Sequence, residues 1–157
     1  MEKYEWSKLN KLQVGAFAEY FVKMELTMHG LRVYSPEVDD HGIDFVTRTT
    51  DGRYLEFQVK SIRGNTRYVF MLKRKFNISP RSYLAFVLFL ESEAPHLYII
   101  PSTVWEQPSA VFVSRDYKES QSESEWGFNV AKKHMPNLEK YRFTSMVEEL
   151  LGVSQEH

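Results

Sequence analysis

The sequence predicts an α/β protein in which a mixed central sheet is flanked by helices, with α+β as the alternative. Three observations favour this class. A segment near the N-terminus has helical apolar spacing, two alternating segments at 42–46 and 54–60 flank a turn, and a continuous apolar run covers 83–90. At 157 residues and 43% hydrophobic content, the chain can bury one sizeable core.

The first predicted element is a helix from the N-cap Ser7 to about Met28, ended by His29 and Gly30. Apolar residues recur through it at helical spacing, which favours one buried stripe. That stripe consists of Leu9, Leu12, Ala16, Phe17, Tyr20, Phe21, Met24 and Met28. A short strand at 31–35 and a loop at 36–41 follow.

The next element is a hairpin whose register can be deduced from its turn. A three-residue loop at 50–52, closed by a glycine, is a common connection and sets Asp44 opposite Gln58 and Phe45 opposite Phe57. One face is then largely apolar and the other polar. A two-residue loop would mix both kinds on each face, so we reject it.

The rest of the chain predicts shorter elements. The run at 83–90 suits a strand covered on both faces, and 118–125 suits an exposed loop. The remaining predictions are strands at 68–72, 96–100 and 111–114, a break or a helix start at 78–82, a helical turn at 101–105, and a terminal helix at 144–151 ended by Gly152.

The polar face of the hairpin carries the candidate chemistry. Asp44 offers a carboxylate, Gln58 an amide oxygen and Lys60 an ammonium group. Magnesium prefers oxygen ligands, and an ammonium can offset charge that develops on a phosphate. The alternatives are a strand-end aspartate bound to turn amides and two solvated strand residues.

Two further carboxylates are candidates for the same site. Glu56 shares the face and could supply the charge that Gln58 lacks, or pair diagonally with Arg48. Glu19 lies beside the apolar stripe of the first helix and could reach a metal through water, or remain a surface carboxylate.

Positive charge gathers directly after these residues. No acidic residue occurs from Phe57 to Leu90, although the net charge of the chain is only -1. Such a stretch favours a polyanionic partner, and a solvated basic loop is the alternative. The candidate nucleic-acid-binding residues are Lys60, Arg63, Arg67, Lys73, Arg74 and Lys75.

Composition excludes several classes of protein. The chain has no cysteine, which rules out disulfides and thiolate zinc ligands and fits a reducing, cytoplasmic location. It shows neither a signal-peptide apolar region nor a run long enough to span a bilayer. We therefore expect a soluble protein without a membrane partner.

Together, Glu19 in the first helix, Asp44 within Gly42-Ile43-Asp44, and Gln58-Val59-Lys60 resemble the PD-(D/E)XK nuclease superfamily, and the glutamine form is most similar to its Mrr-type branch. The resemblance spans about residues 12–105. It implies a restriction-endonuclease-like fold in one nuclease-like domain over 1–157, with a core at about 7–105 and a C-terminal extension at about 106–157.

The resemblance also implies a function. Asp44 and Gln58 would hold Mg²⁺ or Mn²⁺, Lys60 would assist attack by water, and Glu19 would support the site, together with Glu56 as an alternative ligand. The expected activity is metal-dependent hydrolysis of DNA in restriction, repair or mobile-element processing, and a homodimer would suit cleavage of two strands. The alternative is a weak or inactive nuclease-fold domain that binds nucleic acid or a protein.

Overall fold

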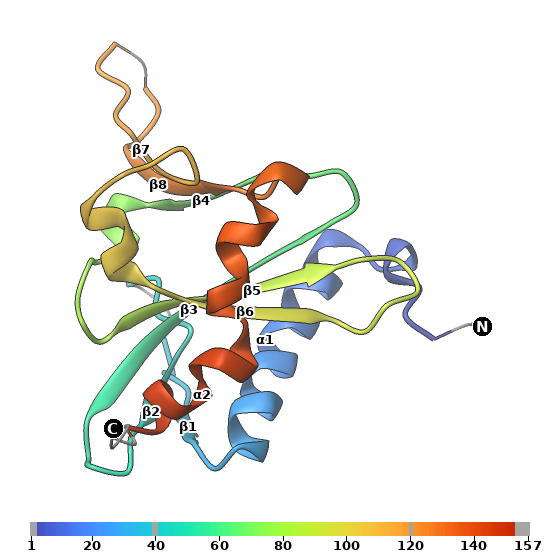
Figure 1. Cartoon of the computed structure of the whole chain (residues 1–157), viewed down its shortest axis with the longest axis vertical. Coiled ribbons are helices and arrows are strands. Elements are labelled where there is room, and N and C mark those ends of the chain that lie inside the picture. Colours follow the sequence, from blue (N-terminus) through green and yellow to red (C-terminus); the bar gives the residue numbers. More distant parts are fainter. Residues whose placement is uncertain (1–2, 39–40, 120, 153–157) are drawn as a thin grey trace.

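Two sheets lie against each other in the computed structural model, which describes residues 3–38, 41–119 and 121–152 (Figure 1). The larger sheet has the strand order β1-β2-β3-β5-β6 and the smaller one β4-β8-β7. The strands are β1 Arg32–Tyr34, β2 Phe45–Arg48, β3 Tyr54–Arg63, β4 Tyr68–Leu72, β5 Ser82–Phe89, β6 His96–Pro101, β7 Phe112–Arg115 and β8 Glu125–Asn129. The predicted α/β class with a mixed sheet is confirmed.

Within the described residues, two α-helices and four 3₁₀ segments complete the fold. α1 and α2 both pack on one face of the larger sheet. The α-helices are α1 Lys11–Met28 and α2 Phe143–Leu151, and the 3₁₀ segments are η1 Trp6–Lys8, η2 Lys73–Lys75, η3 Ser102–Glu106 and η4 Lys132–Tyr141. None of the helices in the described ranges is long and apolar enough to cross a membrane.

The β2–β3 hairpin has the register expected from its turn. Phe45 lies opposite Phe57, and Thr47 lies opposite Leu55. All four side chains are buried against the helices, whereas their neighbours along the strands point to the other face. The hairpin therefore divides apolar from polar side chains, as the period-two pattern predicts.

β5 separates two hydrophobic cores. Every residue of this strand is buried, which confirms the prediction of a strand covered on both faces. Tyr83, Ala85 and Val87 belong to the core beneath α1 and α2, and Leu84 and Phe86 belong to a second core beneath the smaller sheet. The smaller sheet thus covers the β5–β6 half of the outer face.

The helix prediction needs two corrections. The α-helix begins at Lys11, because Asn10 and Gln13 form a reciprocal capping box, while Ser7 instead bonds to Glu91. The residues that face the sheet are Val14, Ala18, Val22 and Leu26. Most of the expected apolar stripe faces solvent instead, including Leu12, Ala16, Tyr20, Met24 and Met28.

The strand β8 was absent from the sequence prediction. It lies between β4 and β7, so that residues late in the chain complete the smaller sheet. Gly127 sits directly beneath the Tyr68 hydroxyl, where any Cβ would collide with it. A tryptophan and a glycine in a short segment do not alternate clearly, and the requirement for glycine arises only from this cross-strand contact.

The hairpin contains a matched pair of buried threonines with opposite polar environments. Thr47 is 0% exposed, and its hydroxyl has no hydrogen-bond partner among the described residues. The Thr49 hydroxyl bonds to Asp51 and to the backbone of Arg53. We expect Thr47→Val to raise the free energy of unfolding by about 1 kcal/mol, because it removes an unsatisfied buried hydroxyl.

Thr49→Val should lower the free energy of unfolding by about 1 to 2 kcal/mol, because it leaves the Arg53 amide without its acceptor. Urea unfolding of both variants measures the difference. Equal destabilisation by the two substitutions would contradict this account of the hairpin.

Candidate active site

Asp44 lies where the backbone pairing of β2 and β3 ends. Its amide donates to the Phe57 carbonyl oxygen at 2.9 Å, and its Oδ2 accepts a hydrogen bond from the Val59 amide at 2.7 Å. The carboxylate therefore accepts from β3 in the place of a backbone carbonyl of the opposite strand. This bond resembles the structural role that the sequence left open for Asp44, and it also holds the carboxylate beside β3.

A cavity of about 330 Å³ lies at this point. Asp44, Gln58 and Lys60 all line it, so the predicted acid, amide and amine share one space. Its other walls come from the loop before β2, from β4 and from η2; these residues are Gly42, Val59, Phe70, Leu72 and Lys75. The site is thus enclosed between the hairpin and the smaller sheet.

Gln58 presents an unsatisfied acceptor in this region. Its Oε1 is buried and has no hydrogen-bond partner among the described residues. Gln58 also lines a neighbouring cavity of about 170 Å³, together with Glu56 and His41. A buried oxygen without a partner is costly, so a cation, a water molecule or a donor from a ligand would stabilise it.

The electrostatic environment of Lys60 lowers its pKa below the usual value. Burial is the largest cause, and the positive charges of Lys75 and Lys11 act in the same direction. The negative charge of Asp44 opposes them and raises the pKa. Three amines and a carboxylate therefore interact across the site, which gives it a concentration of positive charge.

Gly42 brings η2 against the hairpin. Its φ of +78° is in the left-handed region, and a Cβ at this position would lie 2.5 Å from the backbone oxygen of Lys75. Only glycine satisfies both the conformation and the close approach. Gly42 therefore fixes the position of Lys75 relative to Asp44.

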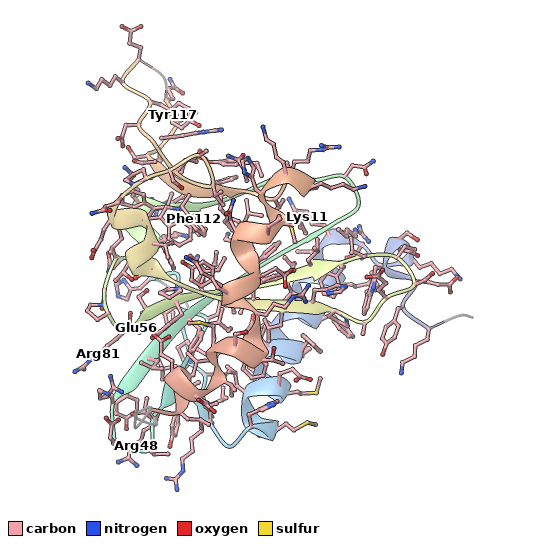
Figure 2. The ribbon with its side chains drawn as sticks, viewed as in Figure 1. Lys11, Arg48, Glu56, Arg81, Phe112 and Tyr117 are labelled. Carbon is pink, nitrogen blue, oxygen red and sulfur yellow. The ribbon has the colours of Figure 1, made fainter. Side chains whose placement is uncertain are left out.

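The two additional carboxylates lie in different surroundings. Glu19 forms an ion pair with Lys23 at 2.9 Å and is not part of the cavity wall around Asp44. Glu56 borders the neighbouring cavity, and its amide donates to the Arg81 carbonyl oxygen. Figure 2 shows Glu56 close to Arg81, with Arg48 further along the hairpin.

The predicted basic residues divide into two groups. Lys60 and Lys75 line the cavity with Asp44, and Arg67 is exposed in the connection after β3. The others have partners within the protein. Arg63 donates to the carbonyl oxygens of Trp6 and Leu9, Lys73 bonds to Ser114 and Asp116, and Arg74 pairs with Glu123.

Several residues that share the polar face were not predicted as site residues. Tyr34 and Tyr54 are exposed, with ring centroids 6.3 Å apart, and Arg32 lies opposite Arg48. The period-two alternation of the hairpin, continued from Glu56 toward the turn, would have placed Tyr54 and its partner Arg48 on the polar face. Lys11 had no such signal, because its proximity to Lys60 arises only when α1 packs on the sheet.

Metal ligation at this site would depend on few residues. Asp44 Oδ atoms and Gln58 Oε1 are the oxygen donors that the hairpin brings to the cavity. Within the described ranges, no group of three or more histidine, cysteine, aspartate or glutamate side chains could hold a metal ion. An amide oxygen fits hard divalent cations but adds no charge.

No protein-family model and no curated protein matches the sequence. Among solved structures, a bacterial homing endonuclease, I-Ssp6803I, is similar with a TM-score of 0.55 and 19% identity, over 91% of this chain and 92% of its own. The Holliday junction resolvase Hjc of Archaeoglobus fulgidus, an archaeal hyperthermophile, has a TM-score of 0.50 and 14% identity, over 91% and 99%. Both have the restriction-endonuclease-like fold, which this chain shares.

The opposing effects on Lys60 can be measured directly. We expect Asp44→Asn to lower the Lys60 pKa further, because it removes the charge that favours the ammonium form. Lys75→Gln should raise the Lys60 pKa, because it removes a repelling charge. NMR titration of the labelled lysine Nζ reports both shifts.

Lys132→Gln is a control, because Lys132 belongs to η4 and not to the cavity wall. A Lys60 pKa that moves in the same direction in the Asp44 and Lys75 variants would refute the electrostatic picture of the site.

Proposed function

We propose that this chain hydrolyses phosphodiester bonds in DNA with a divalent metal ion. The observation that carries the proposal is the cavity in which Asp44, Gln58 and Lys60 meet, on a fold that the chain shares with a homing endonuclease and a Holliday junction resolvase. A carboxylate, an amide oxygen and an amine around one space suit phosphodiester hydrolysis.

Asp44 and Gln58 would hold Mg²⁺ or Mn²⁺ at this site. The buried Gln58 Oε1 supports this assignment, because it lacks a partner of its own. Glu56 and Glu19 are further candidate ligands; Glu56 lines a cavity together with Gln58, whereas Glu19 lines neither of the two cavities around Gln58. When bound, such an ion polarises phosphate oxygens and lowers the pKa of a coordinated water.

The amines of Lys60 and Lys75 would bind the substrate phosphate. Lys60 and Lys75 both line the cavity, so their positive charges would hold the scissile phosphate and offset the negative charge that develops on it. Burial and the neighbouring amines lower the pKa of Lys60. Lys60 is therefore better suited to exchange a proton with the attacking water than an exposed lysine would be.

The open half of the polar face offers a path for the rest of the nucleic acid. From the cavity, the outward side chains of β1, β2 and β3 lead to Tyr34 and Tyr54, and then to Arg32 and Arg48. Arginines there can contact phosphates, and exposed tyrosines can stack on bases. Arg67, exposed in the connection after β3, would add a further positive charge.

A specific observation favours a second candidate function, a domain that binds DNA without cutting it. Gln58 stands at a ligand position without negative charge, and Asp44 already accepts the Val59 amide. A metal held by one carboxylate would bind weakly. For either candidate function, we also propose that the chain belongs to the Mrr-like glutamine branch and that it is located in the cytoplasm.

The charge at position 58 gives a test of the metal site. Gln58→Glu should tighten Mn²⁺ binding by about tenfold, because a second carboxylate joins Asp44. Gln58→Leu should abolish specific binding. Isothermal titration calorimetry measures both, and Gln107→Glu supplies the same charge change in a different cavity as a control.

Unchanged Mn²⁺ affinity in both position 58 variants would remove Gln58 from the proposed ligand set. An equal gain in the Gln107 variant would show that only the net charge of the protein matters.

Cleavage assays decide between the two candidate functions. Supercoiled, linear and branched DNA should be cut in Mg²⁺ or Mn²⁺, and Asp44→Ala or Lys60→Ala should reduce the rate by at least about 100-fold, since each removes a group that acts on the reacting phosphate. Arg81→Ala, outside the cavity wall, serves as a matched control for loss of positive charge.

Cleavage that persists in both active-site variants would assign the activity to another source. DNA binding by the native chain without cleavage would support the second candidate function.

A further inference from the structure

Phe70 is an aromatic side chain that neither hydrophobic core takes up. The chain has 11 phenylalanines, all within the described ranges, and Phe70 alone among them is exposed, at 48%. Its neighbours Val69 and Met71 point into the second core, so the alternation along β4 turns Phe70 to the outer face of the smaller sheet. The residue opposite it in β8 is Gly127, which has no side chain to cover the ring.

Tyr68, on the same side of β4, is held by the protein itself. Its hydroxyl donates to the Glu125 carboxylate at 2.6 Å, and the guanidinium carbon of Arg115 lies 4.1 Å from the centre of its ring. Phe70 has no polar atom to engage in such contacts. Within β4, it is therefore the aromatic ring that is left for a ligand.

The position of Phe70 matters more than its exposure, since single exposed apolar residues are common on protein surfaces. Phe70 and Leu72 line the cavity of about 330 Å³ that also contains Asp44, Lys60 and Lys75. β4 thus gives this cavity an apolar wall, while the hairpin and η2 give it a charged one. A nucleotide has the matching pair of parts, because its phosphate is anionic and its base has a flat apolar face.

The apolar wall selects one state of the nucleotide. In a duplex, each base is stacked between its neighbours and presents only its edges in the grooves, where recognition uses hydrogen bonds that phenylalanine cannot make. A base outside the stack exposes its face, on which an aromatic side chain can stack. Removal of a base from the stack costs least where that base is already unpaired.

We propose that Phe70 stacks on an unpaired base beside the scissile phosphate and so makes DNA with an unpaired nucleotide, such as a bulge, the preferred substrate. This inference rests on the proposed function, because the phosphate occupies the cavity wall formed by Lys60 and Lys75. These two amines hold any phosphate, whereas the ring of Phe70 distinguishes an unpaired nucleotide from a paired one.

An apolar protein surface is the other occupant that an exposed phenylalanine could accept. The rest of the cavity disfavours it. Lys60 and Lys75 require an anion close to Phe70, and the buried Oε1 of Gln58 requires a donor or a cation. A nucleotide with its metal ion meets all of these requirements, and an apolar surface meets only the first.

Binding to matched DNAs tests the role of the ring. Fluorescence anisotropy in EDTA compares a duplex with one unpaired nucleotide, the same duplex fully paired, and a fully paired four-way junction. The native chain should bind the bulged duplex at least about tenfold more tightly than the paired one, because an aromatic side chain stabilises one splayed base by about that factor.

Phe70→Leu should remove this preference, because leucine keeps an apolar side chain but offers no ring, and Phe70→Trp should retain it. Tyr20→Leu is the matched control. It also removes an exposed aromatic ring, but from α1, which packs on the opposite face of the larger sheet. Circular dichroism of each variant establishes that the fold is retained.

Photochemical cross-linking tests the contact itself. With 5-iodouracil as the unpaired base, ultraviolet light should join the DNA to the peptide that contains Phe70, as identified by mass spectrometry. Phe70→Leu should lose this cross-link, and Tyr20→Leu should keep it.

Equal affinity of the native chain for bulged and paired DNA would overturn the inference. So would a preference that survives Phe70→Leu, or a four-way junction bound as tightly as the bulge, since branching would then be the recognised feature. EDTA separates these outcomes from cleavage. A chain that cuts no DNA yet loses its bulge preference in Phe70→Leu would support the role of Phe70 and overturn the nuclease proposal, and cleavage with no dependence on Phe70 would do the reverse.

Discussion

The hydrogen bond from the Val59 amide to Asp44 Oδ2, 2.7 Å long, determines the geometry of the site. β2 begins only at Phe45, so β3 would otherwise present an unpaired amide at Val59. The Asp44 side chain satisfies that amide and turns toward β3 in doing so. Gln58 and Lys60, on either side of Val59, then necessarily lie beside the carboxylate. The limit of the β2–β3 pairing and the assembly of the site therefore meet at the same bond.

The second core determines how much of the sheet remains available to a ligand. β5 is buried on both faces, because α1 and α2 cover one side and the smaller sheet covers the other. Gln58 and Lys60 lie next to Leu84 and Phe86 of β5 in register, at the margin of the second core. This position explains the partial burial of Lys60 and the isolation of the Gln58 oxygen, since protein covers one side of each and a cavity adjoins the other.

Local sequence rules predicted the hairpin because they act over short distances. The turn glycine at position 52 and the period-two alternation together allow only one register that separates apolar from polar groups. The same rules placed Asp44, Gln58 and Lys60 on one face. They did not reveal Lys11, Phe70 or Gly127, because these matter through packing between segments that are distant in the sequence.

The helix shows a different reason for failure. Both sides of α1 are apolar, so periodicity alone fixed neither the start of the helix nor the side that packs on the sheet. The size of the side chains decides which side of α1 packs on the sheet. Val14, Ala18, Val22 and Leu26 are small or compact, which lets α1 approach the aromatic rings of Phe45 and Phe57. Tyr20 and the long methionines would hold the helix away from the sheet.

The size of the side chains also differs between the two sides of α1. The compact side of α1 supports the sheet on which Asp44 and Lys60 are mounted, while its larger apolar side chains remain outside. Leu12, Tyr20, Met24 and Met28 take no part in the sheet core and are exposed. The helix therefore has a compact face that the sheet core accounts for, and larger apolar side chains that the fold leaves exposed.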